Sequence, residues 1–304
     1  MTGVIETAGL TKRYRRVTAV SDLNLRVEPG QVFGFLGPNG AGKSTTIRML
    51  LALQRPTKGR ATLLGLDSAA DSVEIHRRTG YLPGDLELFP RLTGRQHIAW
   101  FADSRGRADS SFIQLLLERF QVVADRPLRE LSKGNRQKIG LVLAFMHQPE
   151  LLVLDEPTSG LDPLMQHEFE NLLRETTAEG RSVFLSSHEL GEVQRIADRI
   201  AIIRDGKLVA EDTVEGLRQA APRKIEIRFR RPVGTAELAA LRGVTVTGAH
   251  GPRLTLEVTG EIGPVLKVIA RHDPVDLTAR PADLDELFLS FYRTPTREEV
   301  SHAG

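Results

Sequence analysis

The sequence has no cysteine among its 304 residues. This absence excludes a disulfide framework, a thiolate zinc site and a cysteine nucleophile. The charges are also nearly balanced: the chain has 41 Lys and Arg residues and 39 Asp and Glu residues, for a net charge of +2. A nucleic-acid-binding protein usually carries a larger basic excess, so we expect no nucleic-acid partner.

Long apolar runs are also missing. No stretch approaches the roughly 18 apolar residues that a membrane-spanning helix needs. The nearest candidates, Ile139–Met146 and Leu151–Leu154, have the lengths of a buried helix and a buried strand. The first residues lack the basic stretch and apolar run of a signal peptide. We therefore expect no direct membrane span, and a function at a membrane would need a second chain.

What the sequence does contain is a long alternation of strand and helix patterns. The apolar runs Gln31–Leu36, Leu151–Leu154 and Ser182–Ser186 are each followed by a helical pattern, which predicts an α/β core with a parallel sheet. Alternating residues in Leu23–Val27 predict an accessory antiparallel strand. Helical spacing from Thr93 to about Ala124 predicts a helical insertion.

A short segment, residues 219–222, is interpreted as a linker to a C-terminal part with its own pattern. The predicted order there is strand, helix, strand, strand, helix, strand, which is the ferredoxin-like signature. We therefore predict two domains, residues 1–218 and residues 219–304, of which the second is a small α+β domain. A last helix over Ala282–Tyr292, with an apolar stripe on one face, is interpreted as a docking helix.

The octet Gly37–Ser44 fits the phosphate-loop pattern G-x-x-x-x-G-K-[ST] at every fixed position. A predicted strand precedes it and a predicted helix follows it, which disfavours an ordinary glycine-rich turn. Such a loop aims backbone N–H groups and a helix N-terminus at phosphate. We predict that Lys43 reaches the β- and γ-phosphates of ATP and that Ser44 binds Mg²⁺. The predicted nucleotide contacts are Gly37, Pro38, Asn39, Gly40, Ala41, Gly42, Lys43, Ser44 and Thr45.

Two carboxylates, Asp155 and Glu156, follow the apolar run Leu151–Leu154. Ligands bind at the carboxyl ends of strands in open α/β sheets. Taken alone, the pair could be an acidic turn in solvent. With a phosphate loop in the same chain, we predict that Asp155 holds Mg²⁺ and that Glu156 is the general base that polarises the attacking water.

A second anion site is predicted at Ser132, which stands at an N-cap-like position before a helix predicted over Arg136–His147. Small residues after Ser132 leave backbone N–H groups open to an anion. Taken alone, the segment would be an ordinary capped helix. Two phosphate-binding helix starts for one nucleotide suggest instead that one of them acts across a dimer.

Together these motifs resemble the ATP-binding cassette of ABC transporters, over roughly residues 4–215. The stretch Leu131–Asn135 is similar to the family signature Leu-Ser-Gly-Gly-Gln and departs from it at two positions. The Ser-Lys-Gly-Asn variant resembles exporters whose membrane subunits are separate chains. The resemblance implies a P-loop NTPase fold with a parallel core sheet, an antiparallel β subdomain and a helical subdomain of about residues 85–150.

The resemblance also implies roles for residues that have weak signals of their own. His188 matches the switch histidine that contacts the γ-phosphate, although alone it would be a surface histidine. Tyr14 matches the aromatic residue that stacks on adenine, although alone it would be a half-buried strand tyrosine. The implied catalytic residues are Glu156, His188 and Lys43. The further implied nucleotide contacts are Ser132, Gly134, Asn135 and Asp162.

One departure from the family concerns Mg²⁺. Related cassettes usually have a glutamine ligand where this sequence has Gly84, and glycine has no ligand atom. Either Asp85 or water then completes the metal shell, or coupling to the membrane partner is altered. We predict Asp85 as the third metal-binding residue, beside Ser44 and Asp155.

The resemblance implies a function. Two cassettes would close head to tail on ATP, which would lie between Lys43 and Ser44 of one and Ser132 and Gly134 of the other. A homodimer is expected, with a hetero-pair as the alternative. The dimer would drive export of a hydrophobic drug, antibiotic or lipid through a transmembrane permease, from the cytoplasmic face of the membrane. The alternatives are an importer ATPase and a soluble cassette ATPase in translation or DNA repair.

Overall fold

The computed structural model describes residues 3–106 and 109–280, and the chain divides into two compact units, Met1–Glu211 and Asp212–Gly304. This division precedes helix α8 (Val214–Ala220), whereas the sequence pattern predicts a boundary at residues 218 and 219. The interpretation of residues 219–222 as a linker is wrong at its start, because α8 continues to Ala220. The predicted docking helix over Ala282–Tyr292 lies outside the described residues.

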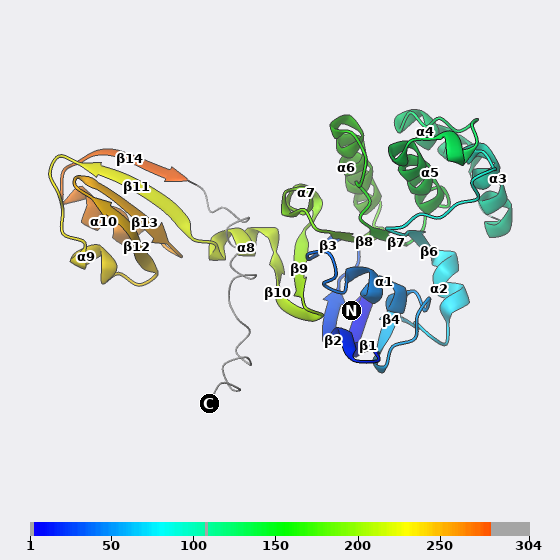
Figure 1. The fold of residues 1–304 in the computed structure, drawn as a ribbon, viewed down its shortest axis with the longest axis horizontal. Coiled ribbons are helices and arrows are strands. Elements are labelled where there is room, and N and C mark those ends of the chain that lie inside the picture. Colours follow the sequence, from blue (N-terminus) through cyan, green and yellow to red (C-terminus); the bar gives the residue numbers. More distant parts are fainter. Residues whose placement is uncertain (1–2, 107–108, 281–304) are drawn as a thin grey trace. The chain divides into compact units, whose positions relative to one another are not determined.

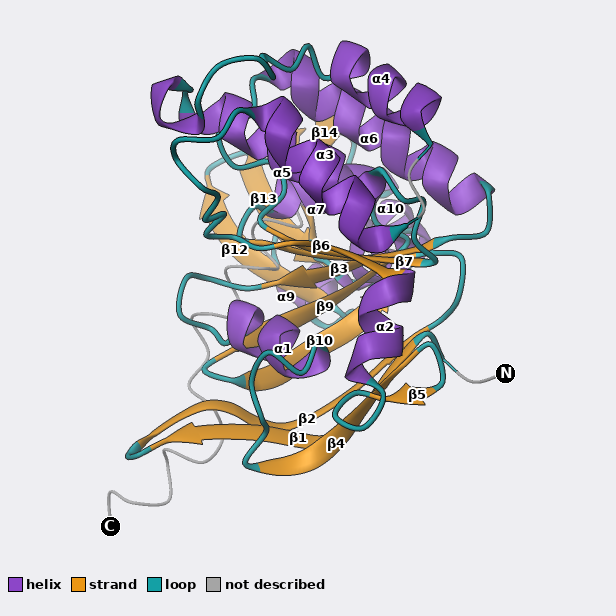
Figure 2. Ribbon diagram, turned by 90° about the vertical axis from the view of Figure 1, so that its right-hand side faces the viewer, coloured by secondary structure: helices purple, strands orange, loops and turns teal. Residues whose placement is uncertain are grey.

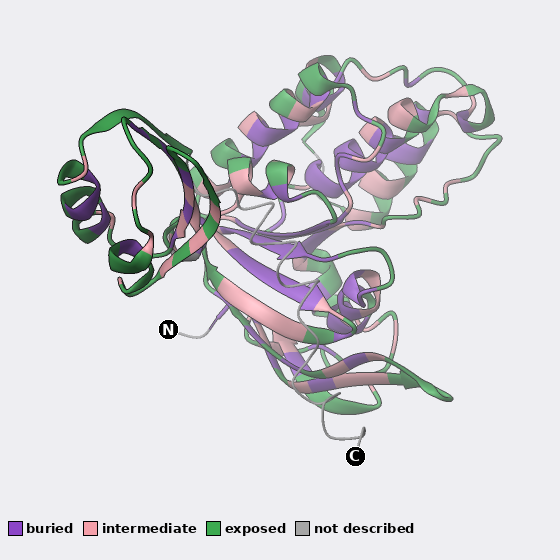
Figure 3. Cartoon of the chain, turned by 60° about the vertical axis from the view of Figure 1, so that its left-hand side comes forward, coloured by how far each residue is buried: buried purple, intermediate pink, exposed green. Residues whose placement is uncertain are grey.

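A six-stranded sheet forms the centre of the first unit, with the order β10-β9-β3-β8-β7-β6 (Figure 1). Strand β3 runs parallel to β8 and β9, and β7 runs parallel to β8 and β6. All residues of β3, β7 and β8 are buried, as their apolar sequences predict, and Figure 3 shows these strands inside the unit. The strands are β3 (Val32–Leu36), β6 (Thr79–Leu82), β7 (Leu151–Asp155), β8 (Ser182–Ser187), β9 (Arg199–Arg204) and β10 (Lys207–Thr213).

A separate antiparallel sheet has the order β2-β1-β4-β5. Along β2 the buried side chains of Leu23, Leu25 and Val27 alternate with exposed Asn24 and Arg26, which confirms the predicted half-exposed strand. Helix α1 (Lys43–Leu50) contacts both sheets, through β2 and β4 on one side and β7 on the other (Figure 2). The strands are β1 (Ile5–Tyr14), β2 (Val17–Val27), β4 (Lys58–Leu63) and β5 (Leu66–Asp67).

Helices α3 to α6 cover the face of the six-stranded sheet opposite α1 (Figures 1 and 2). A capping box of Thr93 and Gln96 starts α3, and the predicted helical insertion contains both α3 and α4. Helix α5 begins at Lys133, earlier than predicted, because the Ser132 side chain caps it. The helices are α2 (Ser72–Arg78), α3 (Gly94–Arg105), α4 (Ser110–Arg119), α5 (Lys133–Phe145), α6 (Pro163–Ala178) and α7 (Leu190–Ile196), with a 3₁₀ turn at Leu128–Glu130.

The second unit has a four-stranded sheet with the order β12-β13-β11-β14, and its described pairings are all antiparallel. Its own apolar core includes residues of β11, β13 and α10. The predicted succession of strands and helices is present. The elements are β11 (Arg223–Phe229), α9 (Ala236–Ala239), β12 (Val244–His250), β13 (Arg253–Val258), α10 (Gly263–Ala270) and β14 (Pro274–Arg280). Across the described parts of both units, every helix is too short or too polar to cross a bilayer.

Candidate nucleotide-binding site

The phosphate loop joins β3 to α1 through a backbone that requires glycine. Gly40 and Gly42 have positive φ angles of 82° and 107°, a region that other residues rarely adopt. At Gly42 an added Cβ would lie 2.5 Å from the Ala19 carbonyl oxygen, and at Gly37 it would lie 2.5 Å from that of Ile203. The loop is therefore held in one curled conformation, with α1 starting at Lys43.

A cavity of about 430 Å³ opens over this loop and over the carboxyl ends of the neighbouring strands. Most residues predicted to bind nucleotide or metal line it: Pro38, Asn39, Gly40, Gly42, Lys43, Ser44, Thr45, Asp85, Asp155, Glu156 and His188. It is also lined by residues that the sequence argument did not select: Ala19, Arg48, Gly84, Lys133 and Ser159. The fold thus brings the phosphate loop and the acidic strand end, far apart in sequence, to one place.

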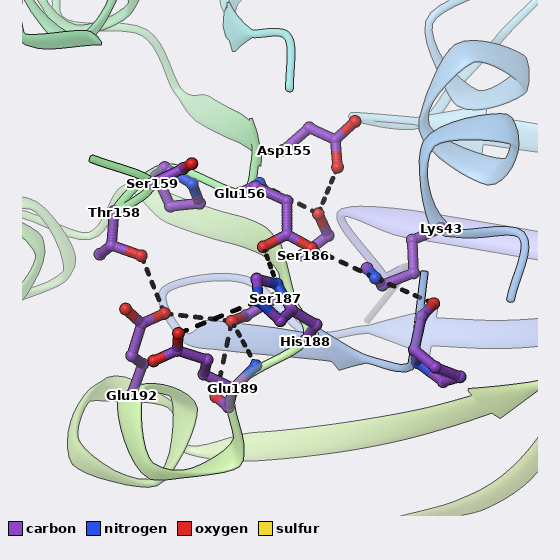
Figure 4. Close-up of polar contacts among 12 residues, drawn as sticks. Lys43, Asp155, Glu156, Thr158, Ser159, Ser186, Ser187, His188, Glu189 and Glu192 are labelled. Atoms are coloured by element: carbon purple, nitrogen blue, oxygen red, sulfur yellow. Dashed lines mark hydrogen bonds and ion pairs between the residues drawn. The ribbon is translucent and has the colours of Figure 1, made fainter. Parts of the chain in front are cut away.

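The centre of the site is a chain of polar contacts through Glu156 (Figure 4). Its Oε1 lies 3.2 Å from Lys43 Nζ, and its Oε2 lies 2.6 Å from His188 Nδ1. Lys43 Nζ also donates to the carbonyl oxygens of Gly37 at 2.6 Å and Pro38 at 3.2 Å. The Lys43 side chain is 6% exposed and that of Glu156 is 21% exposed, so this ion pair is largely shielded from solvent. Glu156 therefore contacts both of the other predicted catalytic residues.

The Glu156 backbone has a φ angle of 51°, in the left-handed region. For a non-glycine residue this conformation costs about 1 kcal/mol or more, and such strain concentrates at functional sites. The Glu156 N–H donates to Ser186 O and Oγ, each at 3.2 Å, on neighbouring strand β8. These bonds hold the strained residue, which directs its carboxylate toward Lys43 and His188 (Figure 4).

The predicted metal residues fit magnesium bound together with ATP. Ser44, Asp85 and Asp155 supply oxygen atoms around the same cavity, and Mg²⁺ bound to nucleotide needs few protein ligands because phosphates and water supply the others. Asp155 is buried at the end of β7 and accepts a hydrogen bond from Ser186 Oγ.

Gly84 faces the Asp155 carboxylate directly. A Cβ added to Gly84 would lie 3.1 Å from Asp155 Oδ2. The position is therefore next to the metal residue, but glycine contributes no side-chain atom there. The pKa of nearby Tyr81 is raised, first by burial and then by the negative charge of Asp155.

Seven predicted nucleotide contacts do not line the cavity of their own chain: Gly37 and Ala41 of the phosphate loop, and Tyr14, Ser132, Gly134, Asn135 and Asp162. Tyr14 lies at the end of β1, 41% exposed, with Lys12 Nζ 5.2 Å from its ring centroid. Asp162 caps α6 by accepting from Met165 N. Ser132 caps α5, and the Asn135 amide bonds both backbone groups of Val123. Gly134 packs against the turn at Gly160, since a Cβ added to Gly134 would lie 2.4 Å from the Gly160 carbonyl oxygen.

Lys133 is the functional candidate that the sequence argument did not select. Its Nζ donates to Ser159 Oγ at 2.9 Å, and both residues line the cavity. The available signal was the departure from the family signature, which places a cation between Ser132 and Gly134. A cation here connects the start of α5 to the turn after β7.

Comparison with known proteins agrees with this geometry. The family model described as ABC transporter matches residues 20–159. An ABC transporter ATP-binding protein of Bacillus subtilis, YcbN, is 35% identical over 230 residues, which cover 75% of each chain. This chain belongs to the ABC transporter ATP-binding proteins. The bacitracin transport ATP-binding protein BcrA of Bacillus licheniformis is 36% identical over 75% of this chain and 76% of its own.

Solved structures show the same cassette fold. The ATP-binding subunit of an ABC transporter has a TM-score of 0.64 and 30% identity, over 71% of this chain and 92% of its own. The dimeric cassette MJ0796, in a post-hydrolysis state with ADP and Pi, has a TM-score of 0.62 and 22% identity, over 69% and 98%. The chain is thus an ABC-type ATPase, as its motifs predict. The ferredoxin-like assignment of the second unit stays a prediction.

Proposed function

We propose that this chain powers an exporter by hydrolysing ATP while bound to a separate membrane-spanning partner, at the cytoplasmic face of the membrane. The observation that carries the proposal is the contact chain from Lys43 through Glu156 to His188 beside the phosphate loop. The similarity to a bacitracin transport protein favours export of an antibiotic or another hydrophobic compound. The relatives are named as transport proteins and do not support a role in translation or DNA repair.

In the proposed reaction, each residue of the contact chain has one task. Lys43 releases the Glu156 carboxylate and binds the β- and γ-phosphates, because a phosphate group offers it more negative charge. Glu156 then accepts a proton from the attacking water, and His188 holds the γ-phosphate. Ser44, Asp155 and Asp85 would hold Mg²⁺, which would neutralise phosphate charge. Tyr14 stacks on the adenine base.

We further propose that the working unit is a head-to-tail dimer. Ser132 and Gly134 do not line the cavity of their own chain, and the family resemblance assigns them to the nucleotide of a facing cassette. A dimer is the state of the similar cassette MJ0796. A homodimer supplies both motif sets twice, and a hetero-pair is the alternative. Asn135 and Asp162 would contact the shared nucleotide through backbone groups, because their side chains are engaged within the chain.

The partner is tested by purification from membranes. The tagged full chain carrying Glu156→Gln, incubated with ATP and Mg²⁺, is expected to retain a polytopic membrane protein through affinity purification in detergent. Recovery of the chain with ribosomes or DNA, in the soluble fraction, would contradict the transporter role. The untagged partner, once identified, can be reconstituted with the chain in vesicles to measure ATP-dependent efflux.

Asp85→Asn tests the third metal residue. We expect the Mg²⁺ concentration for half-maximal ATPase activity to rise about 10-fold, because the loop loses an anionic oxygen beside Asp155. The matched control is Glu87→Gln, which neutralises an exposed acid of the same loop that does not line this cavity. An unchanged Mg²⁺ dependence in Asp85→Asn would leave water as the ligand.

Gly84→Gln is expected to lower the Mg²⁺ requirement, because its side chain would start beside Asp155.

Gly134→Ala tests the signature segment. The added Cβ would lie 2.4 Å from the Gly160 carbonyl oxygen, so the start of α5 must shift away from the turn. We expect the ATP concentration for half-maximal dimer formation, measured by light scattering, to rise about 10-fold, equivalent to about 1.4 kcal/mol. Gly191→Ala is the control, because its added Cβ meets only Arg195 Nη1, at 4.0 Å. Equal dimerisation of the two variants would exclude this segment from the interface.

A further inference from the structure

One carboxylate outside the predicted site connects the two loops that carry Glu156 and His188. Glu192, on α7, accepts a hydrogen bond from Thr158 Oγ1 at 2.8 Å and one from Ser187 Oγ at 3.1 Å, both at Oε2 (Figure 4). Thr158 lies two residues after Glu156, and Ser187 immediately precedes His188. A single oxygen atom therefore joins the segment after β7 to the segment after β8.

Local structure at the start of α7 accounts for only half of this arrangement. Glu192 is the third residue of the helix, and Ser187, which is close to it in sequence, also accepts a hydrogen bond from Glu189 N at 3.0 Å. Thr158 has no part in that start, since it lies 34 residues before Glu192. The bond from Thr158 instead joins α7 to the loop of the candidate base.

The surroundings make these hydrogen bonds rigid. Thr158 is 8% exposed and Ser187 is 1% exposed, so neither hydroxyl group has ready access to water as an alternative partner. Burial raises the pKa of Glu192, and the hydrogen bonds from Thr158 and Ser187 oppose that rise. On its other side, α7 is fastened to α6 because Arg195 Nε lies 2.7 Å from Glu170 Oε1. Glu192 is thus a fixed point between two loops.

We propose that Glu192 is a positioning residue for ATP hydrolysis: by holding Thr158 and Ser187 together, it keeps Glu156 and His188 in contact. The inference rests on the proposed roles of Glu156 and His188. Thr158 is followed by Ser159, the partner of Lys133, and Gly160, the neighbour of Gly134. A shift at the start of α5 is therefore passed to His188 through Thr158, Glu192 and Ser187. This path couples the signature-like segment Leu131–Asn135 to the reacting groups.

The test compares four variants of the full chain in steady-state ATPase assays and thermal melts. Glu192→Ala is expected to lower kcat about 10-fold and leave KM for ATP within about twofold, because small misplacements of reacting groups are costly. Glu192→Gln is expected to restore kcat, because its amide oxygen accepts both hydroxyl hydrogen bonds. Thr158→Val removes one hydroxyl at constant volume and is expected to lower kcat about threefold. Arg195→Ala loosens α7 from α6 but leaves the Thr158 and Ser187 hydrogen bonds to Glu192 in place, so it is expected to lower the melting temperature with a smaller kcat loss than Glu192→Ala.

Three results would overturn the proposal. The first is a wild-type kcat in Glu192→Ala. The second is a kcat loss in Glu192→Gln as large as that in Glu192→Ala. The third is a kcat loss in Arg195→Ala as large as that in Glu192→Ala. If Glu192→Ala fails to fold, Thr158→Val decides, and a wild-type kcat there would contradict the proposal. Failure of the base role is distinguishable, because it would appear as residual turnover in Glu156→Gln while Glu192→Ala still lowers kcat. The Thr158→Val/Glu192→Ala double variant should be no slower than Glu192→Ala alone.

Discussion

Replacing Glu156 with Gln is expected to lower ATP turnover at least about 100-fold, since the variant keeps the size of the side chain and loses the base. ATP binding should remain, because Lys43 and the backbone of the phosphate loop are unchanged. The dimer should then persist with ATP, which size-exclusion chromatography with radiolabelled nucleotide can measure. The melting temperature should change little, because the amide oxygen can still face Lys43.

Glu189→Gln is the matched control for this variant. Glu189 is an exposed acid whose Oε1 lies 3.9 Å from His188 Nε2, on the opposite side of the ring from Glu156. Neutralising it removes one negative charge from the same neighbourhood without touching the contact chain. Its turnover should stay within about twofold of wild type. Substantial turnover in Glu156→Gln would remove Glu156 from the role of base, and a similar loss in both variants would attribute the effect to local charge.

Replacing Lys43 with Met is expected to have two separable effects. Turnover should fall about 100-fold or more, because the charge that binds the developing phosphate negative charge is gone. The fold should also lose stability, because Glu156 Oε1 is buried and Lys43 is its one polar contact among the described residues. Leaving a shielded carboxylate without its partner costs about 2 kcal/mol, or a fall of about 5 °C in melting temperature.

The double variant Lys43→Met/Glu156→Gln separates these effects. Removing both partners of a buried pair is nearly neutral, whereas removing one is costly. The melting temperature should therefore recover at least half of the loss seen in Lys43→Met, although turnover remains abolished. Differential scanning calorimetry without nucleotide gives the comparison. A double variant that melts no higher than Lys43→Met would show that the loss arises elsewhere, for instance at the Gly37 and Pro38 carbonyl groups that Lys43 also bonds.

The motifs were predictable because each is a local property of the chain. Gly37–Ser44 is contiguous, and the positive φ angles at Gly40 and Gly42 agree with the residues that permit them. The strand before Asp155 was predicted because residues in the middle of a parallel sheet are buried on both faces. Ser132 was predicted as a cap from a pattern of a few residues, and the structure confirms it.

Other features were not predictable because they depend on contacts between distant segments. Nothing in the sequence pattern around Glu192 indicates that its side chain bonds Thr158. The structure divides the chain before α8, whereas the sequence pattern predicts the boundary after it, at residues 218 and 219. The sequence showed that Gly84 departs from the glutamine usual in the family. Only the fold shows that Gly84 faces Asp155, since a Cβ added to Gly84 would lie 3.1 Å from Asp155 Oδ2.

By itself, the sequence determined that this chain binds ATP and turns it over. The phosphate loop is recognised within eight contiguous residues, and its presence gave the acidic strand end a role, whereas His188 was assigned through the family resemblance. Only the tertiary structure decided how they are connected: Lys43 and His188 contact the two carboxylate oxygens of Glu156, and Glu192 joins the segment after Glu156 to the segment before His188. The physical reason is that parallel strands β3, β7 and β8 end at the same edge of one sheet. Side chains from residues 43, 156 and 188 become neighbours there, although no local pattern records the distances between them.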